Sequence, residues 1–137
     1  MNQQTNNYDT SKTFIWNNRY QNETITNPSY DTVSLPQGQL MGRNSSTGEL
    51  QPLFSTALDG SEIPLGILVE DLTMAAGEQA TVSICVAGDV AQEMIVLIAP
   101  DTLDTKILGR FLRDRIEGDT LGIKLIASDE LTAFDNQ

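Results

Sequence analysis

Short apolar runs alternate with turn-forming residues throughout positions 39–89, and this alternation limits the possible folds more than any other feature of the sequence. Turn residues gather at Asn44–Gly48, Asp59–Ser61 and Ala76–Glu78, and each group lies next to an apolar run of strand length. Glycine supplies the positive φ that tight turns need, and Asp, Asn and Ser bond their own backbone there. The sequence therefore predicts a mainly-β fold, with a compact body built from antiparallel hairpins.

Two segments of this body have the patterns of particular strands. In residues 81–87, apolar Val82, Ile84 and Val86 alternate with Thr81, Ser83 and Cys85. That period of two predicts a half-buried strand with its apolar side inward. Pro64–Val69 is more continuously apolar, which suits a central strand or a strand buried at a subunit contact, so Leu65 and Ile67 are possible subunit contacts. Gly66 within this run predicts a bulge or a close backbone approach.

Residues 101–117 have the pattern of the one helix in the chain. Asp101 or Thr102 can cap it, and Gly118 is a natural stop. The apolar stripe consists of Leu103, Ile107, Leu108, Phe111 and Leu112. Arg110 and Arg113 lie near the predicted C-terminal end, where they either contact a partner or complement the helix dipole as solvated side chains. Residues 121–127 then predict a last strand.

The first 37 residues differ in composition from the rest, being rich in Asn, Gln, Thr, Ser and Tyr. Such a segment buries too little apolar surface to offset its ordering entropy, so free disorder is expected. We therefore divide the chain into an extended N-terminal arm, residues 1–37, and a β-rich body, residues 38–137. Three islands of β-prone or aromatic residues interrupt the arm; their anchors are Phe14, Ile15, Trp16, Ile25, Tyr30 and Val33.

Such islands suit the addition of a strand to a partner's sheet edge, or the docking of single rings in pockets. The alternative is that the segment wraps its own body as edge strands. The sequence alone leaves both open, and we take binding to another chain as the working hypothesis.

Few residues here have the chemistry of catalysis. The chain has no histidine, which removes the commonest general base and the commonest metal ligand. Cys85 has no cationic neighbour in its strand and is expected to be a small structural residue. Glu70 and Asp71 are neighbours on a strand, so they point to opposite faces rather than into one cleft. We expect no enzyme activity, no metal site and no cofactor.

The formal net charge of −11 argues against nucleic acid and against anionic membranes as partners. A single cysteine cannot form an intrachain disulfide, and no apolar run approaches the roughly 20 residues of a membrane-spanning helix. We therefore expect a soluble product, made in a reducing host cytoplasm.

The order of the motifs resembles the phage head decoration protein family, the lambda-like capsid-stabilising proteins. The matching residues are Gly42, Thr47-Gly48, Asp59-Gly60-Ser61, Gly66-Ile67-Leu68 and Ala87-Gly88. Leu121–Leu125 resembles the closing strand of that family, so the resemblance covers roughly residues 38–126. The long Asn/Gln-rich arm and the stretch between Val90 and Gly118 depart from the family pattern.

The resemblance implies a fold of the β-tulip type with a short helix. It also implies a cement protein that binds the major capsid protein as a homotrimer, at three-fold positions on the outer surface of the virion head. There it would stabilise the expanded head against DNA pressure. A β-sandwich module of a virion that binds carbohydrate or a receptor is the alternative. That alternative requires a cluster of exposed aromatic residues on the body, which offers only Phe54, Phe111 and Phe134.

Overall fold

A computed structural model describes residues 13–119 and 121–127 of the chain. Its strands are β1 (Phe14–Thr26), β2 (Val33–Leu35), β3 (Leu40–Arg43), β4 (Leu50–Pro52), β5 (Gly66–Leu68), β6 (Leu72–Met74), β7 (Gln79–Ala91), β8 (Lys106–Ile107), β9 (Arg110–Phe111) and β10 (Gly122–Ile126). The helical segments are the short 3₁₀ turn η2 (Gln92–Met94), one turn of α-helix, α1 (Leu112–Asp114), and the π-helical η3 (Arg115–Asp119) that continues it. The predicted mainly-β fold with one short helix is confirmed.

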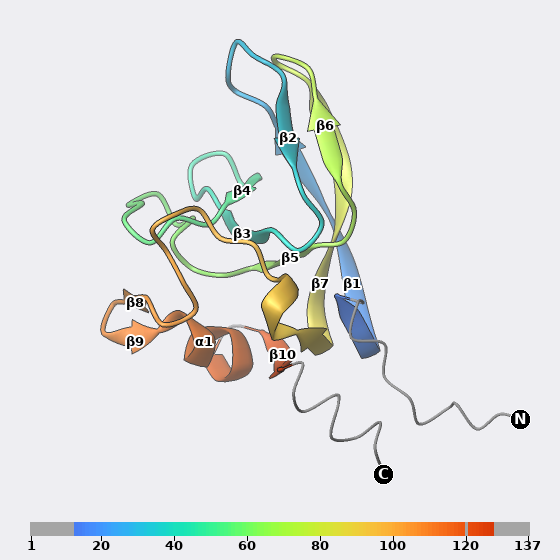
Figure 1. The fold of residues 1–137 in the computed structure, drawn as a ribbon. Coiled ribbons are helices and arrows are strands. Elements are labelled where there is room, and N and C mark those ends of the chain that lie inside the picture. Colours follow the sequence, from blue (N-terminus) through green and yellow to red (C-terminus); the bar gives the residue numbers. More distant parts are fainter. Residues whose placement is uncertain (1–12, 120, 128–137) are drawn as a thin grey trace, which may run out of the picture.

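The main sheet has the strand order β1-β4-β3-β5-β7-β10, and β1 also pairs with β7. The first five strands of this order therefore form a closed circuit, with β10 added parallel to β7. A two-stranded ribbon of β2 and β6 and a small β8–β9 hairpin complete the fold. Figure 1 shows the long β1–β7 ribbon crossing the molecule, with β2 and β6 at one end and β10 and α1 at the other.

The pairing of β1 with β7 corrects the prediction for the N-terminal segment. It is antiparallel and runs from Phe14 opposite Val90 to Thr26 opposite Gln79. Val33–Leu35 forms a second strand, paired with Leu72–Met74. The expected disorder of the arm is therefore wrong for these residues, which wrap their own body. Residues 1–12 of the predicted arm lie outside the described part of the chain.

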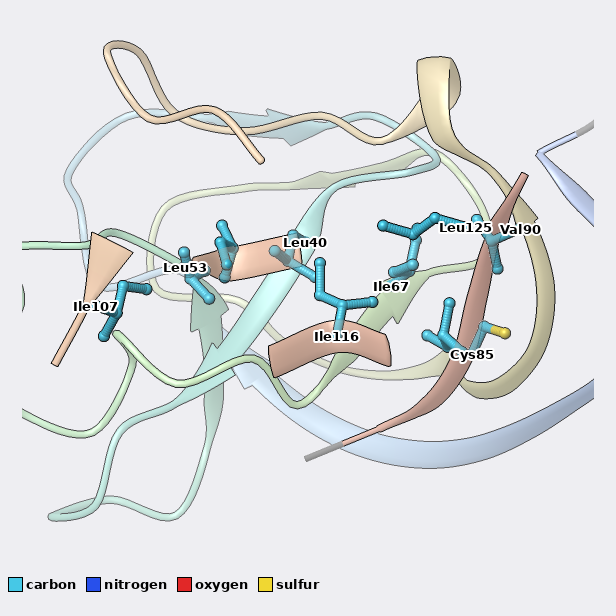
Figure 2. Close-up of a cluster of buried hydrophobic side chains, with 10 residues drawn as sticks. Leu40, Leu53, Ile67, Cys85, Val90, Ile107, Ile116 and Leu125 are labelled. Atoms are coloured by element: carbon cyan, nitrogen blue, oxygen red, sulfur yellow. The ribbon is translucent and has the colours of Figure 1, made fainter. Parts of the chain in front are cut away.

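The core has two clusters. The first cluster includes Leu40, Leu53, Ile67, Cys85, Val90, Ile107, Leu112, Ile116, Ile123 and Leu125, and Figure 2 shows their side chains converging from strands, from the β8 segment and from the helical turn. The second cluster includes Ile25, Met41, Leu50, Leu68, Met74 and Ile84.

Adjacent residues of β7 point into different clusters, because Ile84 belongs to the second and Cys85 to the first. The predicted apolar face does point inward: Ile84 is fully buried, and Val82 and Val86 are partly buried against the second cluster. The strand is not half-buried at its centre, however, since Cys85 on the other face is also fully buried. Gly66 makes the predicted close approach: a Cβ there would lie 2.7 Å from Cδ1 of Ile84.

The helix predicted for 101–117 is wrong over most of its length. Leu108 and Gly109 have φ values of 52° and 84°, and they form the two-residue turn between β8 and β9. Positive φ at both central positions is the type I′ hairpin geometry. Asp101 does not cap a helix, because its carboxylate accepts hydrogen bonds from the backbone N–H and the hydroxyl of Ser55, at 2.7 and 2.6 Å. The last strand is confirmed as β10.

Truncation tests the place of β1 in this fold. Deletion of residues 1–12 removes no described strand, so it should leave cooperative unfolding in urea unchanged. Deletion of residues 1–37 removes the main partner of β7 and the core residue Ile25. A buried isoleucine alone contributes about 2–5 kcal/mol, against a typical total stability of about 5–15 kcal/mol. The longer deletion should therefore abolish the cooperative transition, and a cooperatively folded product would contradict this topology.

Candidate functional site

The predicted anchors of the N-terminal segment fall into different environments on β1 and beyond it. Trp16 is 64% exposed and Tyr30 is 99% exposed, so both are available to a partner. Phe14 and Ile15 are half-buried, and Phe14 packs against the first core cluster. Ile25 is 2% exposed and belongs to the second cluster, so its prediction as a capsid contact is wrong.

Val33 is half-buried on β2, opposite Met74 of β6, so it is fixed within the chain's own ribbon. Tyr30 precedes that ribbon, in the loop between β1 and β2. The structure therefore does not bring Tyr30 and Val33 to the same end of the molecule as Trp16, since β1 separates them by its length.

Tyr20 is a surface residue that sequence reasoning missed. It is 52% exposed on β1, and its ring stands edge-on to that of Phe14, with centroids 6.1 Å apart and planes at 83°. Partial burial raises the pKa of the Tyr20 phenol, and the nearby Cys85 adds to that increase. The sequence signal that could have identified Tyr20 was its position four residues after Trp16. That spacing is informative only if residues 14–26 are recognised as one strand.

One edge of β1 is unpaired over most of its length within the described residues. On one side β1 pairs with β7 from Phe14 to Thr26, with interruptions before Arg19, but on the other only Ile25 has a strand partner, Leu50 of β4. The backbone of residues 14–24 therefore has a free edge, which is a template for a further strand. Trp16 and Tyr20 lie along this stretch.

A bulge shapes the exposed part of β1. The pairing register shifts between Phe14 and Trp16 and again before Tyr20, and Asn17 has a φ of 54°. Gly88 of β7 lies directly against this bulge, because a Cβ there would lie 2.6 Å from Cα of Asn18. The Asn18 side chain fixes it further by donating a hydrogen bond to the carbonyl of Asp89, at 3.0 Å. Gly88, one of the residues that carry the family resemblance, thus permits the shape of this edge.

Two other parts of the resemblance, Asp59-Gly60-Ser61 and Gly42, hold a turn together rather than line a surface. The Asp59 carboxylate accepts hydrogen bonds from the backbone N–H and hydroxyl of Ser61, at 3.0 and 2.6 Å, and from the amide of Gln51, at 3.0 Å. The Ser61 hydroxyl is the main reason that the pKa of Asp59 lies below its ordinary value of 3.8. Gly42 packs so closely on the same turn that a Cβ would lie 2.7 Å from Cα of Ser61.

The four predicted subunit contacts also separate. Ile67 is fully buried in the first core cluster, so its prediction as a subunit contact is wrong. Leu65 is half-buried against the second cluster. Arg113 forms an ion pair with Asp104 at 3.5 Å and donates a hydrogen bond to the side chain of Gln92, so it braces its own chain. Arg110 is exposed on β9.

An apolar groove of about 540 Å³ opens on the second core cluster, at the end of β1 remote from Trp16. Its walls include Ile25, Val33, Leu50 and Met74, and Glu49 is among the polar residues that line it. This volume lies within the range of about 300–1,000 Å³ that is usual for binding pockets.

The described residues contain neither a membrane-spanning helix nor a metal-binding cluster of side chains. No helix there is long and apolar enough to cross a membrane. No group of three or more His, Cys, Asp or Glu side chains in that part of the chain is placed to hold a metal ion. Cys85 is a free, buried thiol whose pKa is raised by burial, and it has the predicted structural role in the first cluster.

Comparison with protein families decides the class of this protein. The family model described as bacteriophage lambda head decoration protein D matches residues 4–107, well over half of the chain. The chain belongs to this family. It is thus a phage head decoration protein, a structural protein of the virion that binds the capsid. No curated protein matches the chain.

The matched region differs from the one that the sequence motifs suggested. It begins at residue 4 and so includes all of β1 and β2, and it ends at residue 107, before β10. Most of the segment that composition set apart as an arm therefore lies within the region that the family model matches.

Substitution of two glycines tests the close packing of Gly42 on the Asp59–Ser61 turn. Gly42→Ala forces a Cβ into the backbone of Ser61, so the free energy of unfolding should fall by about 1–3 kcal/mol. Gly118→Ala is the matched control, since a Cβ there meets nothing within 4 Å. Urea unfolding measures both, and equal stability of the two variants would contradict the close approach.

The hydrogen bonds of Asp59 predict how the stability of the protein changes at acidic pH. Because the folded pKa of Asp59 is lowered, its contribution to stability is present above the ordinary value of 3.8 and is lost as pH falls through the lower folded pKa. Ser61→Ala removes the largest cause of this shift, so unfolding free energy below pH 3.8 should fall less steeply than in the wild type. Ser46→Ala, an exposed serine, should keep the wild-type slope; the same slope in Ser61→Ala would refute the assignment.

Proposed function

We propose that the protein binds the outer surface of a tailed-phage head as trimers at three-fold positions, and stabilises the expanded shell against DNA pressure. The family match carries this proposal. Three copies held together attach with greater avidity than one, so each contact with the shell can be modest. The product is made in the host cytoplasm and acts on the virion.

The contact with the major capsid protein is assigned to the free edge of β1. Residues 14–24 lack a strand partner on one side, and Trp16 and Tyr20 are exposed along them. A strand from the shell that paired with this edge would gain main-chain hydrogen bonds, and the two rings would supply apolar contact. Ile15, half-buried at the start of the strand, lies within the same contact.

The positions of the two ends of the described chain support an orientation in which the Trp16 end of β1 faces the shell. The backbone N–H of Ala91 donates to the carbonyl of Thr13, and Ile126 pairs with Ala91. The segments before Thr13 and after Ala127 therefore both leave from the Trp16 end of the molecule. If that end faces the shell, residues 1–12 can extend onto neighbouring capsid subunits and bind there.

A tryptophan substitution tests the assigned surface. Trp16→Ala should weaken binding to undecorated expanded heads by about tenfold or more, since exposed tryptophans at interface centres are frequent hot spots worth about 2 kcal/mol. Leu58→Ala is the matched control, because Leu58 is 98% exposed but lies in the loop after β4. Co-sedimentation with heads measures both affinities, and unchanged thermal unfolding of the free proteins shows that neither variant is misfolded.

Two results would count against this function. Equal binding of Trp16→Ala and wild type would remove the capsid contact from the β1 edge. Heads that release their DNA at the same temperature with and without bound protein would contradict the stabilising role, whichever surface is used.

A further inference from the structure

The β8–β9 hairpin carries an apolar side chain in an unfavourable backbone conformation. Leu108 has a φ of 52° and is 79% exposed at the tip. The left-handed region costs a residue with a Cβ about 1–2 kcal/mol, and Asn, Asp or Gly usually occupies this position of a type I′ turn. Strained residues of this kind are concentrated at functional sites such as ligand clamps and switch regions. The tip has the form of a small apolar knob, with Phe111, 43% exposed, beside it.

The hairpin is also a basic region of an acidic chain. Residues 106–111 include the basic residues Lys106 and Arg110 and no acidic residue, although the net charge of the chain is −11. Lys106 is exposed, with its ammonium group 5.1 Å from the centre of the Phe111 ring. A partner for the tip is therefore expected to offer an apolar recess with a negative charge at its side.

The groove on the second core cluster has these properties. Its walls include apolar side chains from β1, β2, β4 and β6, and polar residues complete the lining, Glu49 among them. The Glu49 carboxylate accepts an exposed hydrogen bond from the Gln79 amide at 3.3 Å, which a cation could replace. The hairpin packs on the first cluster through Ile107, whereas the groove opens on the second. Figure 1 places the β8–β9 hairpin and the β2–β6 ribbon in different parts of the molecule, so one copy does not fill its own groove.

The terminal segments are also poor candidates for the groove of their own copy. Both terminal segments begin beside Ala91, at one end of β7. The groove lies near Ile25, which pairs with Ala80 at the other end of β7. Eleven strand residues separate these positions, about 36 Å. The apolar side chains Tyr8, Leu131 and Phe134 are five, four and seven residues from the last described position, so they reach at most about 18, 14 and 25 Å. Met1 alone is far enough along the chain.

We infer that the Leu108 tip of one copy inserts into the apolar groove of the next copy, with Lys106 beside Glu49. Because the two surfaces differ, the contact is head-to-tail, and such contacts form rings when the rotation closes. The inference deepens the proposed function, since it identifies the surfaces that would hold the proposed trimer together.

Paired cysteines test this contact directly. The variant Leu108→Cys with Val33→Cys places thiols at the tip and on the groove wall, while the natural Cys85 is fully buried. A disulfide needs Cβ atoms about 3.5–4.5 Å apart, so mild oxidation links copies only when the tip is seated. On decorated heads the double variant should give two- and three-chain species on a non-reducing gel. A mixture of the two single variants should stop at two chains, and each single variant alone should give none.

Charge exchange supplies an independent readout. In the double-cysteine background, Lys106→Glu or Glu49→Lys should each lower the cross-linked yield about two- to fivefold, as expected for exposed ion pairs. The two changes together should restore it, whereas Glu70→Lys, on a different face, should leave it unchanged. Failure of the combined variant to recover any yield would overturn the pairing of Lys106 with Glu49.

The design separates this inference from the capsid role. Cross-linking is carried out both on heads and on the concentrated free protein. Absence of linked chains in both samples overturns the inference, and so does equal linking by Leu108→Cys alone. Linked chains in the free protein together with no co-sedimentation with heads would support the inference and refute the capsid role.

Discussion

The antiparallel pairing of β1 with β7 is the interaction on which the rest of the structure depends. It closes the circuit of five strands and brings Ile25 into the second core cluster. It also places the start of the described chain beside Ala91, where the parallel pairing of β10 with β7 places the other end. Because β7 occupies only one side of β1, the same pairing leaves the other edge of residues 14–24 without a partner. Stability and the proposed capsid contact therefore arise from the two sides of one strand.

Glycines allow this arrangement at the points where backbones meet. Gly88 accommodates the β1 bulge, Gly66 approaches Ile84, and Gly42 packs on the Asp59 turn. At each point an added Cβ would lie within 3.0 Å of a neighbouring atom, which is too close for normal packing. The residues that carry the family resemblance are thus largely those that let a short chain fold so tightly. The surface residues proposed to bind the shell lie outside that set.

The sequence predicted the elements whose signal is local. Turn residues beside alternating apolar runs identified the β body, and the apolar face of residues 81–87 was placed correctly. The N-terminal segment was misjudged because its strand is held by backbone pairing to β7, fifty or more residues away, and composition does not reveal such a partner. Trp16 and Tyr30 are exposed, as a binding role requires, but Ile25 and Ile67 are core residues. The sequence could not separate the two pairs, because an apolar residue in a strand has the same pattern whether it faces a core or a partner.

The predicted helix failed for a related reason. An apolar stripe at spacings of four and five fits a helix, but it also fits a hairpin followed by a helical turn, where Ile107, Leu112 and Ile116 face the core. Leucine in a left-handed conformation at a hairpin tip has no local signal, and only the adjacent Gly109 indicated a turn.

The central claim is that the free edge of β1 faces the shell. A cryo-electron microscopy map of decorated heads, at a resolution that separates strands, tests it most directly. We expect a strand of the major capsid protein beside residues 14–24, with Trp16 and Tyr20 covered. A map in which that edge is exposed to solvent while the β2–β6 ribbon contacts the shell would contradict the account.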